Sequence, residues 1–472
     1  MTRSPTNDQD VAADYLLLGT IITMDQQRRV ISNGAVAVRG DVIVAVGTEA
    51  ALKADYPSAK RVGSATDLVT PGYLNGHQHL TGDRLIQSSI PDDLAPGESV
   101  FSWAVPVHAV HTGDDDELSA TLTLAEALSN GVTSTWEAGT VAHPERVAEA
   151  AAKVGARVTI GTWGWDVEQG PFAGSVDEVM ARQQRCLDVG GSPLVSTWVS
   201  LVGHDLMSDE LVVAAADLAR MADTGLTFHL SPSTSDPESY LARTGRRPLA
   251  HMADLGVLDE RVVIAHAVHI DDEEIDILID TGSAVVSCPW AYLRLGQGVT
   301  RDFRHLDIWR RGGRLALGCD SENAGDMVDG LRVASLFAGL AKDVPSDPTG
   351  FGAHQAMELL TIAGAEALGV SDRVGSIEVA KQADLVVHDR KLINWVPHSD
   401  DPVLQLVWGS DGRSVRDVFV AGRKVVANHE VVGVDLSELS EQALIAGGSL
   451  LQRAGVSTAP VWPAHGSASE QR

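Results

Sequence analysis

The chain has 472 residues, of which 44% are hydrophobic and 21% are charged, and its formal net charge is −28. This length suits one large barrel-sized domain with an accessory domain. No run of about eighteen or more apolar residues occurs, and the polar, acidic N-terminus lacks the basic start and apolar core of a signal peptide. We therefore expect a cytoplasmic protein. Because Lys and Arg are not clustered, nucleic acid and anionic membranes are excluded as expected partners, which leaves a small molecule.

Short apolar, β-branched segments occupy the first part of the chain, at residues 15–24, 35–38 and 42–46. They are separated by Asn33-Gly34 and by Arg39-Gly40-Asp41, a spacing typical of antiparallel strands joined by turns. Similar segments return near the other end, at residues 383–387 and 415–426. We therefore predict one small β-sandwich built from both chain ends.

The predicted domain boundaries follow from this pattern. The sandwich comprises residues 14–68 and 375–435, and residues 69–374 form a second domain. Residues 1–13 are predicted to be a disordered arm, and residues 436–472 to be a C-terminal helix and a loose tail, since the last eighteen or so residues are rich in Ser, Ala, Pro and Gly.

The central segment alternates strand-like and helix-like patterns. Helices are expected at 116–130, 208–224 and 271–281, where acidic residues stand at the start and Gly follows the end in each case. Eight strands alternating with helices over about 250 residues favour a (β/α)₈ barrel over a doubly wound open sheet, because no GxGxxG follows the first strand. The strands are expected to end near His79, Trp136, Thr162, Leu201, Leu230, Ala267, Cys288 and Asp320.

The first barrel strand ends in His77-Gln78-His79. Side chains at i and i+2 of a strand point to the same face, so both imidazoles can hold one metal ion. Barrel active sites lie at the carboxyl ends of the strands. Three more candidate ligands stand at later strand ends, namely His229, His266 and Asp320. Together with His77 and His79 they predict a metal site at that end of the barrel.

The sequence resembles the amidohydrolase superfamily, in particular the branch of cytosine, guanine and S-adenosylhomocysteine deaminases and triazine hydrolases. The resemblance lies in residues 69–79, in Ala265-His266-Ala267-Val268-His269, in Gly318-Cys319-Asp320-Ser321 and in residues 374–387, which are similar to the family's "iGSlevGKxADlvv" segment. It implies that His77, His79, His229 and Asp320 bind one divalent metal, Zn²⁺ before Fe²⁺, and that His266 either binds it or contacts the attacking water. It also implies that the metal activates this water and that Asp320 carries its proton.

Two departures from the family pattern stand beside these matches. Pro232 occupies the position three residues after the strand-five histidine, where deaminases of this branch carry a proton-shuttling Glu. Ser287, Ala291 and Tyr292 replace His, Ser and Asn of the family's strand-seven HxPxSN motif. A ring-deaminase mechanism therefore lacks its usual proton carrier.

Asp236 and Glu238 follow Pro232 on what is predicted to be one loop. The simpler interpretation makes both of them exposed loop carboxylates, and the alternative is that one reaches back into the site. If neither does, Asp320 carries out all proton transfer, which suits hydrolysis of an amide, urea, carbamate or lactam.

Further pocket residues follow from the barrel and the resemblance. Trp103 and His204 stand where the family places substrate-contacting Trp and His side chains. An aromatic wall is predicted from side chains near the strand ends, namely Trp136, Trp163 and Trp165, with Glu137 nearby. Strand four, Trp198-Val199-Ser200-Leu201, carries no Lys or Glu that would support a second metal, so one metal is expected.

Cysteine usage indicates no disulfide framework. Cys186, Cys288 and Cys319 are odd in number and form no CxxC, so buried thiols are predicted. Homodimers are common in the family, and a homodimer is expected here.

The leading hypothesis is a metal-dependent hydrolase acting on a C–N bond of a small cyclic or aromatic compound. The alternatives are a deaminase or chlorohydrolase of an N-heterocycle with relocated proton carriers, a metal-dependent lyase or hydratase, and a binding protein that has lost catalysis.

Overall fold

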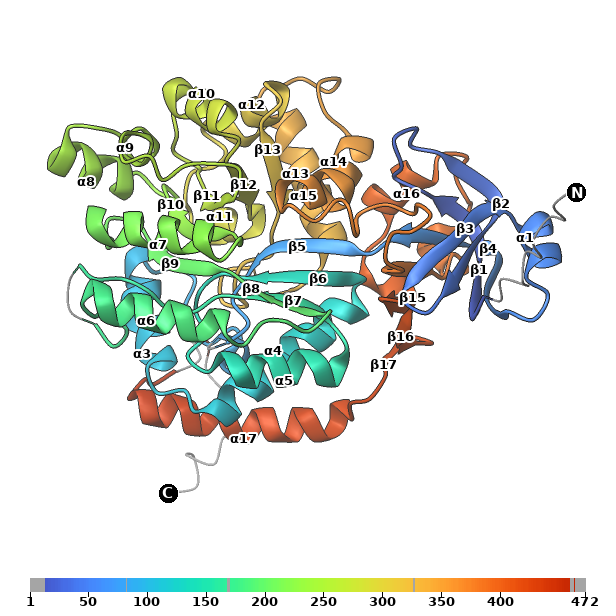
Figure 1. Cartoon of the computed structure of the whole chain (residues 1–472), viewed down its shortest axis with the longest axis horizontal. Coiled ribbons are helices and arrows are strands. Elements are labelled where there is room, and N and C mark those ends of the chain that lie inside the picture. The colour runs from blue at the N-terminus through green and yellow to red at the C-terminus, as the bar shows by residue number, and fades with distance from the viewer. Residues whose placement is uncertain (1–12, 82, 168–169, 326, 459–461, 463–472) are drawn as a thin grey trace, which may run out of the picture.

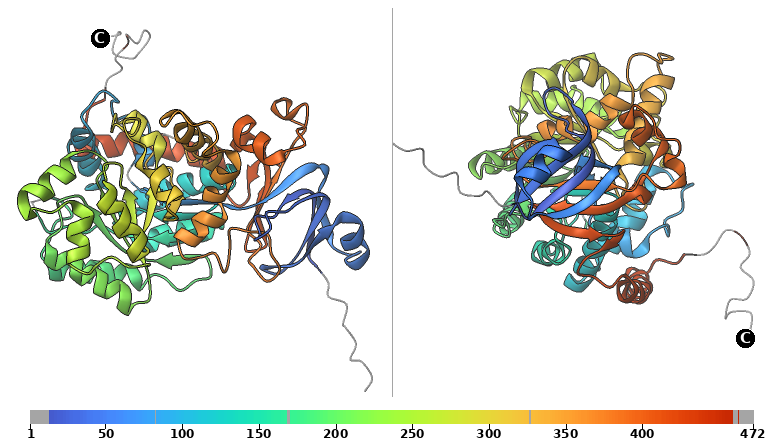
Figure 2. Two further views of the ribbon diagram at one scale, coloured as in Figure 1. Left: turned by 90° about the horizontal axis from the view of Figure 1, so that it is seen from above. Right: turned by 90° about the vertical axis from the view of Figure 1, so that its right-hand side faces the viewer.

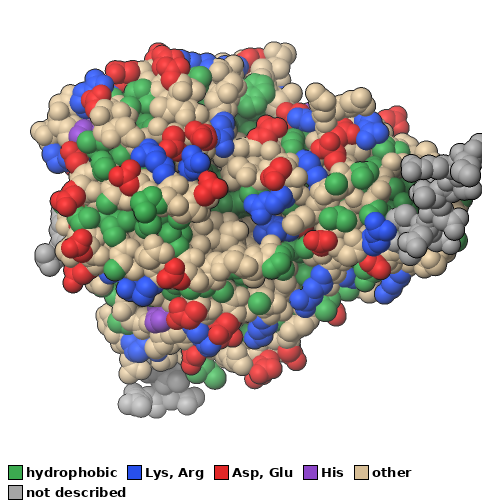
Figure 3. All heavy atoms as spheres, viewed as in Figure 1, with side chains coloured by type: hydrophobic (Ala, Val, Ile, Leu, Met, Phe, Trp, Pro, Cys, Tyr) green, Lys and Arg blue, Asp and Glu red, His purple; other side chains and the backbone are tan. Residues whose placement is uncertain are grey.

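The computed structural model describes residues 13–81, 83–167, 170–325, 327–458 and 462. Most of the predicted N-terminal arm and part of the predicted C-terminal tail lie outside these residues. No helix within the described part of the chain is long and apolar enough to cross a membrane. On the face drawn in Figure 3, Lys and Arg side chains are interspersed with Asp and Glu.

Parallel strands form the centre of the larger part of the molecule, and helices cover them (Figure 1). One sheet has the order β5-β6-β7-β8 and the other β13-β12-β11-β10-β9. These strands are β5 (Tyr73–Gln78), β6 (Val132–Glu137), β7 (Arg157–Ile160), β8 (Val195–Thr197), β9 (Val199–Gly203), β10 (Leu226–Leu230), β11 (Val262–His266), β12 (Ala284–Ser287) and β13 (Arg314–Leu317).

The two parallel sheets meet at both of their edges. Only Trp198 separates β8 from β9, and its indole Nε1 donates a hydrogen bond to the Glu137 carbonyl at 2.9 Å. At the other edge a parallel bridge joins Gln78 to Asp320. Counting β8 and β9 as one interrupted strand, the observed strand ends differ from the predicted ones by at most three residues.

Helices follow most of the parallel strands and begin at recognisable capping residues. Thr112 and Asp271 each form a capping box at the start of α4 and α10. The helices are α1 (Glu49–Asp55), α2 (Pro96–Glu98), α3 (Val105–His108), α4 (Gly113–Ser129), α5 (Pro144–Val154), α6 (Val176–Leu187), α7 (Asp209–Met221), α8 (Ser235–Thr244), α9 (Pro248–Asp254), α10 (Asp272–Thr281), α11 (Pro289–Arg294), α12 (Arg304–Arg310), α13 (Gly330–Asp343), α14 (Ala353–Leu360), α15 (Ile362–Ala367), α16 (Pro402–Gly409) and α17 (Leu436–Ala454), with shorter turns η1 (Asp83–Ile86), η2 (Ser99–Ala104), η3 (Ile393–Trp395) and η4 (Gly412–Ser414).

Both chain ends contribute to one eight-stranded sheet at one end of the molecule (Figure 2). Its order is β17-β16-β15-β14-β4-β1-β2-β3. The predicted division of these strands into the two layers of a sandwich stays a prediction. The strands are β1 (Tyr15–Ile22), β2 (Val30–Arg39), β3 (Val42–Thr48), β4 (Lys60–Pro71), β14 (Leu385–His388), β15 (Val415–Val420), β16 (Arg423–Ala427) and β17 (Glu430–Val431).

Helix α17 runs along the outside of the larger part and packs against α4, α3 and η1 (Figure 1). Leu450 on α17 is fully buried in a cluster with Leu85 and Val107. Arg453 near the helix end pairs with Asp115 at 2.6 Å. The C-terminal helix therefore supports the segment that follows β5, which forms one wall of the cavity described below.

A buried ion pair joins β7 to the residue that precedes β14. The Arg157 guanidinium donates Nε and Nη2 to the two Asp384 carboxylate oxygens, each at 3.0 Å. The Ala421 amide donates to the same carboxylate at 2.7 Å. If one partner of a buried pair is removed, the other charge is left unpaired in a medium of low polarity, which costs stability. The pair therefore holds the parallel sheets against the eight-stranded sheet.

We predict that Arg157→Ala lowers the free energy of unfolding by about 3–5 kcal/mol. Arg261→Ala is the matched control, because Arg261 pairs at the surface with Asp223, and it should cost at most about 1 kcal/mol. Chemical denaturation of both variants measures the difference. Equal losses would contradict the role given to the buried pair.

Candidate metal centre and active-site cavity

His77 and His79 both lie at the carboxyl end of β5, as the alternation of a strand requires. Their ring centroids are 5.1 Å apart and the planes are nearly perpendicular. Asn75 precedes them on the same strand, and its side-chain oxygen accepts a hydrogen bond from the Cys319 amide at 2.9 Å. This bond holds the end of β5 against the segment that follows β13.

His229 and His266 come from the ends of β10 and β11. The His77 ring centroid lies 4.9 Å from that of His229 and 5.1 Å from that of His266. His229 Nδ1 lies 2.7 Å from the Val202 carbonyl and can only donate to it, so the lone pair of His229 is on Nε2. A backbone acceptor on one nitrogen is the usual way in which proteins orient a metal-binding imidazole.

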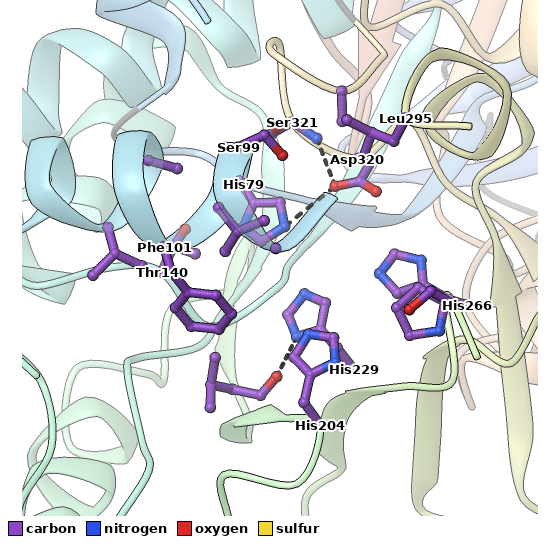
Figure 4. A pocket seen from close by; sticks show the side chains of 18 of the residues that line it. His79, Ser99, Phe101, Thr140, His204, His229, His266, Leu295, Asp320 and Ser321 are labelled. Atoms are coloured by element: carbon purple, nitrogen blue, oxygen red, sulfur yellow. Dashed lines mark hydrogen bonds and ion pairs between the residues drawn. The ribbon is translucent and has the colours of Figure 1, made fainter. Parts of the chain in front are cut away.

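Asp320 completes the group from the segment after β13. Its Oδ1 lies 3.3 Å from His79 Nε2 and 3.8 Å from His77 Nε2, and it also accepts the Ser321 amide at 2.8 Å (Figure 4). The Asp320 amide donates to the His77 carbonyl at 2.9 Å. This backbone contact fixes the distance between the carboxylate and the first two histidines.

Burial favours the neutral form of His77, His229 and His266, whereas at His79 the hydrogen bond and the charge of Asp320 outweigh burial and raise the pKa. Desolvation lowers the pKa of His77 and His229 well below the ordinary value and lowers that of His266 to about 4. Burial alone would raise the pKa of the Asp320 carboxyl, but the His79 hydrogen bond and the charges of His77 and His266 lower it. Neutral imidazoles and an ionised carboxylate are the protonation states in which these groups bind metal.

The donor set fits a divalent metal such as zinc. The buried His77 Nε2, His79 Nδ1 and His266 Nδ1 atoms have no hydrogen-bond partner within the described structure. Potential ligand atoms within 4.8 Å of one another occur in two overlapping groups, His77, His79 and His229, and His77, His266, Cys288 and Asp320. All five predicted ligands are thus brought together, and their binding of one metal stays a prediction.

Cys288 is the neighbour that sequence reasoning did not place at the metal centre. Its side chain is fully buried, like the free thiols of Cys186 and Cys319. Burial raises the pKa of Cys288 well above its ordinary value, so the group is a neutral thiol without a metal. The prediction of three unpaired, buried cysteines is confirmed, with one of them closer to the site than expected.

The backbone at the site departs from ordinary strand geometry. His266, Asp320 and His204 adopt φ values of 79°, 67° and 56°, in the left-handed region that costs energy for residues other than glycine. Gly203, with φ of 86°, precedes His204, and a Cβ there would lie 2.0 Å from the His229 carbonyl oxygen. Glycine is therefore required where β9 passes close to β10, and it turns His204 towards the cavity.

The partly exposed His204 and the buried Asp236 form a pair beside the metal centre. His204 Nδ1 lies 3.0 Å from Asp236 Oδ2, and the Ser231 amide donates to the same oxygen at 2.7 Å. The His204 ring stacks on His229, with centroids 5.8 Å apart (Figure 4). Burial would lower the pKa of His204, but the Asp236 carboxylate raises it.

The interpretation of Asp236 as an exposed loop carboxylate is wrong. Asp236 is 4% exposed and lies in the first turn of α8, while Glu238 on the same helix is exposed. Helix α8 begins soon after Pro232, so its first turn brings Asp236 back under β10. The difference arises because residues 235–244 form a helix and not the loop that their sequence predicts.

A cavity of about 430 Å³ opens at these strand ends. Its lining includes four of the five candidate ligands (all but His77), together with His204, Asp236 and Pro232, and on other sides Asp83, Phe101, His108, Thr140, Trp163 and Asn323. Figure 4 shows Phe101 and Thr140 across the pocket from His266.

Trp103 is not among the lining residues of this cavity. Its ring packs with Leu85 and Val107 in the cluster that α17 covers, because η2 turns its Phe101 side chain and not its Trp103 side chain to the cavity. Of the predicted aromatic wall, Trp163 lines the cavity, whereas Trp136 and Trp165 are packed in hydrophobic clusters. Glu137 is fully buried and accepts hydrogen bonds from Gly139 and Thr140.

The altered strand-seven motif has a structural counterpart on α12. His305 is 1% exposed and lies between Ser287 and His266. Ser287 Oγ is 3.2 Å from His305 Nδ1, and His305 Nε2 is 2.5 Å from the His266 carbonyl oxygen. His305 therefore holds the strained backbone of a candidate ligand and fills the space beside Ser287.

The sequence profile of the Amidohydrolase family matches residues 68–425, and an imidazolonepropionase-like composite domain of bacteria matches residues 34–59. The chain belongs to the amidohydrolase family. It is 29% identical over 432 residues, 91% of this chain and 97% of the relative, to a 5-methylthioadenosine/S-adenosylhomocysteine deaminase of Syntrophobacter fumaroxidans.

Solved structures agree with this assignment. A zinc-bound adenosine deaminase of Xanthomonas campestris superimposes with a TM-score of 0.87 and 28% identity, over 94% of this chain and 99% of that one. A zinc complex of atrazine chlorohydrolase from Arthrobacter aurescens TC1 has a TM-score of 0.81 and 23% identity, over 92% and 100% of the two chains, and supports the fold alone. The predicted superfamily and the predicted class, a hydrolase of non-peptide C–N bonds, are confirmed.

Metal content provides the first test of the site. We predict about one zinc ion per chain after purification. The variant His229→Asn should lose the bound metal, because the substitution removes an Nε2 ligand atom that β10 and the Val202 carbonyl hold in place. Elemental analysis of dialysed protein measures both. Full retention of metal by the variant would show that His229 is not a ligand.

His305 provides the second test. We predict that His305→Leu weakens metal affinity by about 10–100-fold, because the His266 backbone loses the donor that holds it. His251→Leu is the matched control, since His251 is also buried but pairs with Asp209 away from the centre. Competition with a chelator measures affinity, and equal values for the two variants would contradict the positioning role.

Proposed function

We propose that the protein is a zinc-dependent aminohydrolase that removes an exocyclic amino group from an N-heterocycle and releases ammonia. Relatives that span nearly the whole chain at 28–29% identity are named deaminases of adenosine-type compounds, which supports this proposal. The cavity has room for a ligand of this size, since small-molecule pockets begin at about 300 Å³.

The pair of the buried Asp236 and the partly exposed His204, beside Pro232, supports this proposal most directly. Proline cannot exchange protons, so the deaminase carboxylate is missing from its usual position in the chain. Asp236 supplies a carboxylate from α8 instead, and it holds His204 Nδ1–H at 3.0 Å. This bond leaves His204 Nε2 as the nitrogen that can contact a ring nitrogen of the substrate in the cavity.

The reaction needs a nucleophile, a proton acceptor and a group that contacts the substrate. His77, His79, His229, His266 and Asp320 would hold the zinc ion, which when bound would lower the pKa of a water molecule so that it can attack near neutral pH. Asp320 uses Oδ1 for its contacts with His79 and the Ser321 amide, so Oδ2 is the atom that can take the proton of the water. The C–O bond forms first, by addition of the water oxygen to the ring carbon, and the C–N bond then breaks as the amino group takes that proton and leaves as ammonia.

A second candidate is hydrolysis of a cyclic amide, urea, carbamate or lactam. Pro232 favours it, because attack on a carbonyl requires no prior protonation of a ring nitrogen and Asp320 alone can carry the proton. A chlorohydrolase and a lyase or hydratase are further alternatives. Release of ammonia, release of chloride, ring opening, or addition without hydrolysis distinguishes them.

The finer architecture also belongs to the proposal. We infer that the two parallel sheets close into one (β/α)₈ barrel over residues 69–374, with residues 14–68 and 375–435 as the accessory domain. The short gap at Trp198 and the bridge from Gln78 to Asp320 support closure. A cytoplasmic location and a homodimer stay predictions.

We predict that Asp236→Asn lowers kcat/KM for ammonia release by at least about 100-fold, since it removes the carboxylate that orients His204. Glu238→Gln is the matched control on the same helix and should leave the rate unchanged. Adenosine and other amino-substituted heterocycles serve as substrates of the zinc-loaded enzyme. Unaltered ammonia release by Asp236→Asn would overturn the role of the pair, and ring opening without ammonia would favour the second candidate.

A further inference from the structure

The cavity has a wall away from the metal centre that the proposed reaction does not use. It is formed by the segment after β5, which includes η1, η2 and α3, and by Trp163 after β7. Two of its side chains, His108 and Trp163, are 5% and 4% exposed, and their rings meet edge to face at 5.3 Å. Each carries a polar atom that has no hydrogen-bond partner among the described residues.

His108 offers an acceptor. Its Nε2 lies 3.3 Å from Asp83 Oδ1, and burial lowers the pKa of His108, so the ring is neutral and donates Nε2–H to Asp83. A neutral imidazole with one N–H has a lone pair on the other nitrogen. That nitrogen, Nδ1, is buried and has no hydrogen-bond partner in the described structure.

Trp163 offers a donor beside this acceptor. Its indole Nε1 is buried and likewise has no partner in the described structure. Phe172 stacks on the same ring with centroids 4.5 Å apart and planes within 4°, so the indole is held in place. An unpaired donor and an unpaired acceptor on one cavity wall call for a ligand group that can both accept and donate, and a hydroxyl is such a group.

The charge of the cavity restricts the ligand further. Among the described residues that line it there are four aspartates and no Lys or Arg. Asp205 is paired with Arg243, which stands outside the lining, and Asp83 and Asp236 are paired with His108 and His204. The wall therefore has no cation that could neutralise a carboxylate or phosphate of the substrate.

We propose that His108 and Trp163, with Asp83 behind His108, form a recognition subsite for a hydroxyl of the substrate, and that the site takes uncharged nucleosides and rejects anionic or zwitterionic ones. The proposal rests on the proposed aminohydrolase activity. Of the two compounds in the relatives' names, it selects 5-methylthioadenosine over S-adenosylhomocysteine, which carries a carboxylate.

The experiment compares adenosine, its 2′- and 3′-deoxy analogues, 5′-methylthioadenosine, adenosine 5′-monophosphate and S-adenosylhomocysteine on the zinc-loaded enzyme. We expect loss of one ribose hydroxyl to lower kcat/KM by about tenfold or more, because the buried partners are then left unpaired. The kcat/KM values for the monophosphate and for S-adenosylhomocysteine should be lower still, relative to that for adenosine. Comparable rates for the deoxy analogues and adenosine, or for the charged and uncharged compounds, would overturn the proposal.

Two variants link the preference to the subsite. In His108→Leu and, independently, in Trp163→Phe, the loss of kcat/KM caused by the missing hydroxyl should shrink to about twofold or less. The kcat/KM of these variants for adenosine itself should fall about tenfold. Trp290→Phe is the control, because its indole donates to the Arg332 carbonyl outside the cavity. A full hydroxyl penalty in both subsite variants would contradict the assignment.

Binding without turnover separates this proposal from the proposed function. Calorimetric titration of the zinc-loaded enzyme with adenosine and its deoxy analogues measures recognition whether or not ammonia is released. A hydroxyl-dependent affinity without any ammonia would support the subsite and contradict the aminohydrolase. Ammonia release at the same rate with and without the hydroxyls would support the aminohydrolase and contradict the subsite.

Discussion

The hydrogen bond from the Asp320 amide to the His77 carbonyl, 2.9 Å long, is the contact on which the site depends. It joins the end of the last parallel strand to the end of the first, and the Asn75 side chain reinforces it through the Cys319 amide. Because the carboxyl ends of parallel strands lie at one edge, this contact places the carboxylate of residue 320 against the histidines at 77 and 79. Burial lowers the pKa of His77, His229 and His266, and one nitrogen each of His77, His79 and His266 has no hydrogen-bond partner within the described structure.

The sequence was sufficient for residues whose position follows from strand periodicity. His77 and His79 share a face because strand side chains alternate, and His229, His266 and Asp320 stand at the ends of recognisable apolar strands. The burial of Asp236 could not be predicted, since it depends on where α8 begins. His305 and Cys288 were missed for a similar reason: their approach to the centre depends on how α12 and the end of β12 pack and not on a local pattern.

The resemblance to the family implied that Trp103 contacts the substrate, but its side chain does not line the cavity. Which side chain of η2 faces the cavity is set by α17, more than 300 residues later in the chain, which covers Trp103 and leaves Phe101 at the pocket. The two departures from the family pattern, at Pro232 and Ser287, are accompanied by Asp236 and His305 respectively. In both cases the group that occupies the space comes from a neighbouring helix.

The central claim is that histidine nitrogens and the Asp320 carboxylate, and not the Cys288 thiol, hold a single zinc ion. X-ray absorption at the zinc edge of the purified protein tests it directly. The account predicts a shell of nitrogen and oxygen ligands at about 2.0–2.2 Å, with imidazole scattering and no sulfur. A sulfur ligand at about 2.3 Å, which would place Cys288 on the metal, or a zinc–zinc distance would contradict it.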